Sequence, residues 1–161
     1  MNILITGATR PQSFKTLKAF EEDRVVMADY GDVPLFPSAK YSFISLGERN
    51  DDILAHNLLN ACLDNDIDHL MPLYNFEIKA VAKAAVLFSE FNIEVLLPDI
   101  TILSKYNRVY NPVTEHYVVY IKGKVVYSSE PWAPKQKDIL SGAFYIREEN
   151  DVVITNLLTV Y

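Results

Sequence analysis

Apolar and polar residues follow two different patterns along this chain, and the first covers about 108 positions. Five short runs are rich in β-branched and other apolar residues, and this composition favours strands. The runs are Asn2–Thr6, Arg24–Asp29, Ser42–Leu46, Asp68–Met71 and Glu94–Leu97. Several intervening stretches show helical spacing, with plausible N-caps at Ser13, at Asn50 or Asp51, and at Asn75. We therefore predict βαβ units and a Rossmann-like, three-layer α/β domain over residues 1–108, with a parallel sheet of about five strands.

The second pattern begins after about residue 112 and is typical of antiparallel strands. His116–Ile121 and Lys124–Ser128 are strand-like runs that meet across Lys122-Gly123, a hairpin signal. Ala143–Arg147 and Val152–Tyr161 predict a second hairpin. Residues 109–161 are therefore predicted to form an antiparallel β extension of the α/β domain.

This extension also predicts self-association. In residues 117–121 and 152–154, both faces of the strand are apolar or aromatic. A two-hairpin layer buries one face against its own core, and the other face would leave an apolar patch beside free strand edges. A homodimer through the extension is the prediction, because closed two-fold dimers are the commonest solution for such a surface. The alternative is an extension that folds back over the parallel sheet and hides both faces.

Composition and charge narrow the class of protein. The 161 residues carry a net charge of −6, with 15 Lys and Arg against 21 Asp and Glu. No basic stripe is present to neutralise phosphates, which disfavours a nucleic-acid-binding function. Cys62 is the single cysteine, so an intrachain disulfide is excluded. No secretory leader is recognised and the apolar runs are too short for a membrane span, so a cytoplasmic location without membrane contact is expected.

Ligands of open parallel sheets bind beyond the carboxyl ends of the strands, which draws attention to the segment after the first strand. It contains one glycine, Gly7, whereas a dinucleotide-binding fingerprint needs further glycines. Arg10 is one of the residues that stand where those glycines would be. The loop could still hold a small anion on the amides at Ser13, with Arg10 as the counter-charge; the alternative is a tight turn with a solvated arginine. Asp29 ends the second strand, where a loop-capping role is favoured over ribose binding.

The segment after the fourth strand is the better candidate for a ligand site. It places Tyr74, Asn75 and Glu77 where a strand becomes a helix, with Glu77 in the first helical turn. A helix start with an N-cap and a dipole-complementing Glu explains the same residues without a ligand. The predicted ligand-binding set is therefore Gly7, Arg10, Ser13, Tyr74, Asn75 and Glu77.

Motifs for catalysis and metal binding are not recognised in the sequence. His56, His69 and His116 are scattered, without the spacing of a zinc site. Cys62 lies on an apolar helical stripe, which favours a buried thiol over a nucleophile. We therefore predict no catalytic residue and no metal site, and the sequence identifies no cofactor.

Three segments carry a resemblance to a known family: the opening Met1–Arg10, the strand exit Asp68–Glu77, and Glu94–Asp99 with its Leu-Leu-Pro-Asp. They resemble the pre-ATP-grasp domain of carbamoyl-phosphate synthase large-subunit-like proteins, over about two-thirds of the chain. Lys105 fits the place where the family's ATP-grasp portion begins, while Ser104 replaces its usual acid. This family often carries an acidic residue in the segment that corresponds to Leu73–Glu77, and the resemblance implies that Glu77 is this residue and faces the ligase active site.

In this family, further subdomains supply the adenine pocket, the phosphate-binding lysines and the magnesium ligands, and the residues after Arg108 are too few to build them. Two functions are therefore weighed. The first is a non-catalytic, ATP-grasp-derived binding or accessory module, with a separate ATP-grasp subunit as its partner. The alternative is a small Rossmann-like enzyme that binds a nucleotide or nucleotide-sugar at the Gly7–Ser13 loop.

Overall fold

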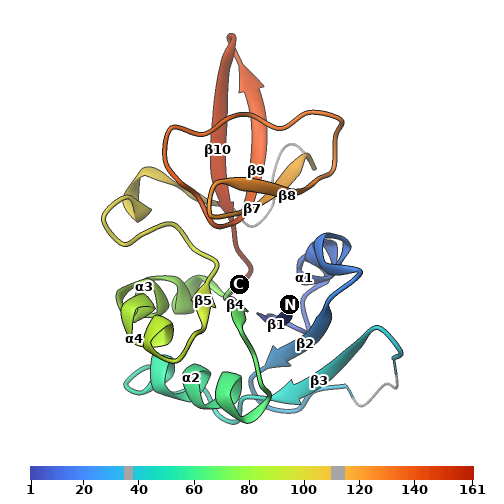
Figure 1. Cartoon of the computed structure of the whole chain (residues 1–161), viewed down its shortest axis with the longest axis vertical. Coiled ribbons are helices and arrows are strands. Elements are labelled where there is room, and N and C mark those ends of the chain that lie inside the picture. Colours follow the sequence, from blue (N-terminus) through green and yellow to red (C-terminus); the bar gives the residue numbers. More distant parts are fainter. Residues whose placement is uncertain (35–37, 110–114) are drawn as a thin grey trace.

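The computed structural model describes residues 1–34, 38–109 and 115–161, and its first part forms a parallel sheet (Figure 1). The strands are β1 (Asn2–Thr6), β2 (Arg24–Asp29), β3 (Tyr41–Ser45), β4 (His69–Met71) and β5 (Glu94–Val95). They pair in the order β3-β2-β1-β4-β5, and every pairing is parallel. The predicted Rossmann-like α/β fold is confirmed, and the strand order reverses between β1 and β4.

Alternate residues of β1 enter two separate core clusters. Leu4 joins a cluster with the buried side chains of α2 (Leu54–Asp64), α3 (Asn75–Lys83) and α4 (Ala85–Glu90). Ile3 and Ile5 join the other, which includes Phe20 at the end of the 3₁₀ helix η1 (Leu17–Phe20), directly after α1 (Pro11–Thr16). This period of two is what a strand between two packed layers requires.

Three predicted helix starts need correction. The first helix begins at Pro11, with Arg10 as its N-cap residue. Proline suits the first helical position because a backbone N–H there would have no partner within the helix, so its absence costs nothing. Ser13 is therefore not an N-cap. The second helix begins at Leu54, several residues after Asn50 and Asp51. The third has Asn75 as its first helical residue, after the N-cap residue Tyr74.

The second sheet contains β6 (Arg108–Val109), β7 (Tyr117–Ile121), β8 (Lys124–Ser128), β9 (Gly142–Glu149) and β10 (Val152–Leu158), in the order β6-β10-β9-β7-β8. Both predicted hairpins, β7–β8 and β9–β10, are present and antiparallel. The description as purely antiparallel needs one correction, since β6 pairs in parallel with β10.

The strand β7 is buried on both of its faces within a single chain. Tyr117, Val118, Val119 and Tyr120 are each at most 4% exposed. Val118 and Tyr120 belong to the core cluster of Leu4, whereas Tyr117 and Val119 belong to that of Ile3. This chain therefore covers both faces of β7, which offers no free apolar face, whereas Val152 and Val153 of β10 stay exposed. The homodimer stays a prediction, for which the edge strand β8 keeps Val125 and Val126 exposed.

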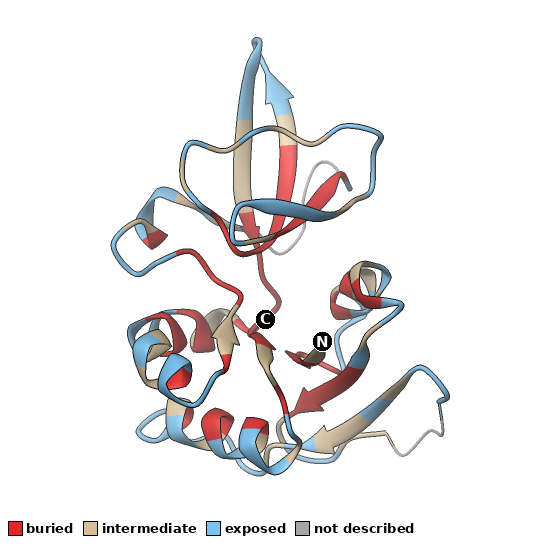
Figure 2. Ribbon diagram, in the orientation of Figure 1, coloured by how far each residue is buried: buried red, intermediate tan, exposed pale blue. Residues whose placement is uncertain are grey.

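The chain's last residues return to the first sheet. The segment from Leu157 to Val160 is buried, and Figure 2 shows this buried stretch running from the second sheet towards the centre of the first. The Val160 amide donates to the Leu73 carbonyl, and the Asn75 amide donates to the Val160 carbonyl. The two predicted parts therefore share backbone hydrogen bonds at the exit of β4. None of the helices in the described ranges is long and apolar enough to cross a lipid bilayer.

Candidate functional site

The loop after β1 is a tight turn held by Gly7 and Ser13. Gly7 has φ +82°, and a Cβ at this position would lie 2.7 Å from the Ser13 hydroxyl oxygen. That hydroxyl is fully buried and donates to the Gly7 carbonyl at 2.6 Å. Glycine is required here both by its left-handed conformation and by the close approach of Ser13. The two predicted residues thus contact each other, and the Ser13 hydroxyl points into the turn.

Most amides of this loop are already hydrogen-bonded within the chain. The Thr9 amide donates to the Asp29 carboxylate at 2.7 Å, and the Arg10 amide donates to the Gly7 carbonyl. The amides of Ala8 and Ser13 donate to backbone carbonyls as well, and Pro11 has no amide hydrogen. A phosphate cradle needs several free amides that converge on one point, so this loop is poorly suited to hold one.

Glu77 lies at the carboxyl edge of the sheet, as predicted, but it is fully buried. The Thr6 hydroxyl donates to Glu77 Oε2 at 2.6 Å, and the Tyr30 hydroxyl donates to Oε1 at 2.7 Å. The Tyr74 amide donates to Oε2 as well, at 3.3 Å. Burial raises the pKa of Glu77 to about 7, and these hydrogen bonds offset part of the increase. Glu77 therefore joins β1, the end of β2 and the start of α3 from inside the fold.

A second buried carboxylate, Asp29, stands beside the first. It accepts hydrogen bonds from the Thr9 hydroxyl at 2.6 Å and from the Tyr74 hydroxyl at 2.7 Å, and it is 2% exposed. The loop-capping role expected for Asp29 is confirmed by its bond to the Thr9 amide. The exposed Arg10 guanidinium lies 5.9 Å from the centre of the Tyr74 ring, so Arg10 and Tyr74 are brought together at this edge.

An aromatic cluster covers the edge beside these carboxylates. The rings of Tyr74 and Phe76 are stacked at 4.8 Å, and Tyr30 packs against both. The exposed Arg49 guanidinium lies 3.6 Å from the centre of the Phe76 ring, a cation–π contact. The rings pack side by side within the chain, and this contributes to the burial of Glu77 and Asp29.

The open part of this edge lies between the start of α3 and the segment from Ile100 to Arg108. There a hollow of about 500 Å³ is lined by Asn75, Lys79, Ile100, Leu103, Ser104, Tyr106, Asn107 and Arg108. The guanidinium Nη1 of Arg108 donates to Asn75 Oδ1 at 2.8 Å and to the Asn75 carbonyl at 3.3 Å. Both acceptors are neutral, and among the described residues no carboxylate lies within ion-pair distance of Arg108.

The charges of this hollow are all of one sign. Lys79 and Arg108 are its charged residues, and its other lining side chains are amides, a hydroxyl, a phenol and two aliphatic groups. Arg108 is half-buried and held in place by Asn75, which reduces the entropy cost of an added hydrogen bond. A guanidinium fixed in this way presents donors in a geometry that matches a phosphate or a carboxylate.

Sequence reasoning found only part of this arrangement. Asn75 was predicted and lines the hollow, whereas Arg108 and Lys79 were not singled out. The signal for Arg108 was weak, since a lone arginine 33 positions from Asn75 has no motif to mark it. Cys62 is buried as expected, and burial raises the pKa of its thiol to about 12, which removes the thiolate at neutral pH.

Comparisons with known proteins include two solved structures that align with part of this chain. No protein-family model and no curated protein sequence matches this chain. A biotin carboxylase from Campylobacter jejuni, solved as a β-γ-ATP complex, aligns with 17% identity and a TM-score of 0.49 over 66% of this chain and 25% of its own. The biotin carboxylase subunit of a pyruvate carboxylase aligns with 19% identity and a TM-score of 0.47, over 64% and 24%. The chain spans about a quarter of the length of these two structures.

Proposed function

We propose that this chain is an anion-binding accessory module, related to the pre-ATP-grasp domains of ATP-dependent ligases and without catalysis of its own. The observation that carries the proposal is the Arg108 guanidinium, which is fixed by neutral acceptors and lines a hollow without acidic residues. The ligand would be a phosphate or carboxylate group, bound between Arg108 and Lys79.

The chemistry of the hollow favours binding over turnover. Its two charged groups are a guanidinium and an ammonium, which are poor general bases because they stay protonated at neutral pH. None of the residues that line the hollow carries a carboxylate. Glu77 and Asp29 are buried and engaged by hydroxyl and amide donors, and Asp138 accepts a hydrogen bond from the Tyr106 hydroxyl at 2.7 Å. A proton acceptor would therefore have to come from elsewhere.

The partner in this proposal is a separate ATP-grasp subunit, which would supply the nucleotide pocket and the magnesium ligands. The sequence resemblance of Asp68–Glu77, Glu94–Asp99 and Lys105 to pre-ATP-grasp domains is the reason for this choice. Lys105 is exposed and lies 3.5 Å from the Asp138 carboxylate. In this location it is available to a partner after a modest change of its surface ion pair.

The alternative function, a nucleotide or nucleotide-sugar enzyme at the Gly7–Ser13 loop, has less support. Its phosphate would need the amides that already donate to Asp29 and to the Gly7 carbonyl. It would also need space at Ser13, whose hydroxyl is buried against Gly7. Arg10 is the one predicted residue of this loop that is exposed.

Replacing Arg108 by glutamine is expected to weaken the binding of phosphate-containing or carboxylate-containing ligands at least tenfold. Isothermal titration at low ionic strength with inorganic phosphate, ADP, ATP and citrate measures this and separates the two ligand classes. Removing one charge-assisted contact costs roughly 1.5–3 kcal/mol, which is about one to two factors of ten in affinity. Lys79→Gln changes an exposed residue of α3, so it should lower the affinity for the same ligands without disturbing the fold.

The matched control for both variants is Lys124→Gln, which removes an exposed positive charge from β8, the edge strand opposite β6 in the second sheet. Equal affinities for Lys124→Gln and the wild-type chain are expected. A loss of affinity in this control equal to that in Lys79→Gln would show a general charge effect, and unchanged affinity in Arg108→Gln would refute the proposed site.

The purified chain alone is expected not to turn over ATP. The ligand-facing groups of the hollow can hold an anion, yet phosphoryl transfer also needs metal ions and a group that orients the nucleophile. A phosphate-release assay with ATP and magnesium, compared with a protein-free control, tests this. Turnover above the control that disappears in Lys105→Ala would contradict the accessory role and favour an enzyme.

A further inference from the structure

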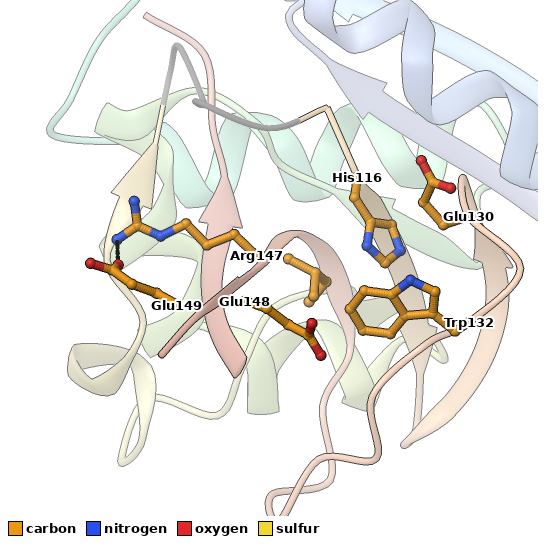
Figure 3. A pocket seen from close by; sticks show the side chains of 7 residues that line it. His116, Glu130, Trp132, Arg147, Glu148 and Glu149 are labelled. Carbon is orange, nitrogen blue, oxygen red and sulfur yellow. Dashed lines mark ion pairs between the residues drawn. The ribbon is translucent and has the colours of Figure 1, made fainter. Parts of the chain in front are cut away.

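A second hollow lies on the far sheet and has the opposite charge. It has a volume of about 520 Å³ and lies between the start of β7, the end of β9 and the loop after β8 (Figure 3). The side chains of His116, Glu130, Trp132 and Glu148 surround it, with the Arg147–Glu149 ion pair at one side. It shares no lining residue with the hollow that Arg108 lines. Arg108 belongs to β6, which is the edge strand opposite β8 in this sheet.

Trp132 is the only tryptophan in the chain, and 42% of its surface is exposed. The ring is held in place: the His116 ring meets it edge-on at 4.5 Å, with an angle of 70° between the two planes. The loop that carries it is fixed by Ser128, whose hydroxyl oxygen lies 2.8 Å from the carbonyl oxygens of both Glu130 and Trp132. A large ring that is both exposed and fixed offers a preorganised surface for a ligand.

The carboxylates around Trp132 outnumber the cations available to them. Arg147 forms an ion pair with Glu149 at 3.1 Å, so these two charges offset each other. Within the described ranges, Glu130 and Glu148 have no ion-pair partner. Both of these side chains are exposed on residues that line the hollow. The hollow therefore combines an aromatic surface with two uncompensated negative charges.

We propose that this hollow binds an organic cation, an alkylammonium or guanidinium group, against Trp132 and between Glu130 and Glu148. A positive charge near a tryptophan face is attracted by the ring quadrupole, and carboxylates on either side add charge and hydrogen-bond acceptors. A bare metal ion fits less well, because no cluster of three or more metal-ligating side chains occurs among the described residues. The cation would come from a free amine or from a lysine or arginine side chain of another protein.

The sole tryptophan makes the test direct, since its fluorescence reports on this hollow alone. Titration of the full chain with butylammonium, tetramethylammonium and argininamide should give a saturable change in emission. Titration with sodium chloride at the same ionic strength should not. Glu130→Gln combined with Glu148→Gln should weaken the binding at least tenfold, whereas Glu90→Gln, an exposed change on α4, should leave it unchanged.

A short lysine-rich and arginine-rich peptide separates the two sources of the cation. Binding of the peptide at least tenfold tighter than argininamide supports a protein side chain as the ligand, and equal affinities support a free amine. A signal that does not saturate with any of these cations would overturn the proposal, as would equal affinities of the wild-type chain and the double variant. The fold of each variant should stay intact, because the substituted glutamates are exposed, and thermal unfolding of each variant checks this.

Discussion

Replacing Glu77 by glutamine is expected to stabilise the protein above neutral pH by roughly 3 kcal/mol, and to leave its stability near pH 4.5 almost unchanged. The reason lies in the pKa of the buried carboxyl group, which is raised from 4.5 to about 7. Each unit of pKa difference between the folded and unfolded states changes the free energy of unfolding by about 1.4 kcal/mol. The protein with Glu77 ionised is therefore less stable by roughly 3 kcal/mol than the protein with Glu77 protonated.

The sign of this effect follows from the protonated form being favoured in the fold. A carboxyl group with a raised pKa contributes its full stability below the unfolded value, and this stability is lost as the pH rises through about 7. Burial is the main cause of the raised pKa, since desolvation disfavours the carboxylate. The wild-type chain should therefore become less stable between about pH 4.5 and 7 through this one residue.

Glutamine has the shape of the protonated carboxyl group and keeps most of its hydrogen bonds. Its carbonyl oxygen can accept from the Thr6 hydroxyl and the Tyr74 amide, and its amide can donate to the Tyr30 oxygen. Urea unfolding of both proteins at pH 5 and pH 8 measures the difference, and groups that titrate equally in both cancel. An identical difference at the two pH values would contradict the assigned role of Glu77.

Glu77→Ala separates the hydrogen bonds from the charge. This variant leaves the hydroxyls of Thr6 and Tyr30 without their acceptor, and each unsatisfied buried group costs about 1–3 kcal/mol. It should therefore be destabilised at both pH values. Glu90→Gln on the surface of α4 is the control for loss of a negative charge and should change neither value.

The first sheet could be predicted from the sequence because its strands are marked by local patterns. β1 and β2 have the predicted bounds, and the run at β4 is one residue shorter than predicted. Helix starts were less predictable. The start at Pro11 follows from the fixed φ of proline, yet the serine two residues later looked like the stronger signal. Its hydroxyl turned inward because Gly7 leaves room for it, which is a property of the folded loop.

Pairings between distant segments could not be predicted from local patterns. The strand β6 has two residues, too few for any periodicity, and it becomes a strand because β10 lies beside it. The insertion of Val160 next to Leu73 has the same origin. The burial of Glu77 also depends on distant residues, since Tyr30 and Thr6 are 47 and 71 positions away. The sequence identified the edge of the sheet but not which of its side chains face solvent.

The largest loss of stability is expected for Tyr120→Glu, which should prevent folding. Tyr120 is 1% exposed, its ring lies edge-on to Phe144, and its hydroxyl donates to the Pro134 carbonyl at 2.7 Å. An ionised carboxylate at this position would be buried without a cation, at a cost of several kcal/mol. That cost, added to the lost packing, is comparable to the whole stability of a small domain, which is about 5–15 kcal/mol.

Circular dichroism and thermal unfolding measure this effect, with Tyr120→Phe and Val126→Glu as matched controls. Tyr120→Phe keeps the ring and loses the hydrogen bond to Pro134, so it should cost about 1 kcal/mol. Val126→Glu places the same charge on the exposed edge strand β8 and should leave the fold intact. If the chain forms the predicted homodimer through this edge, sedimentation at tens of micromolar protein should show Val126→Glu shifted towards the monomer. A folded, monomeric Tyr120→Glu would contradict the burial of β7 on both faces, because it would place Tyr120 in an interface between chains and not in the core.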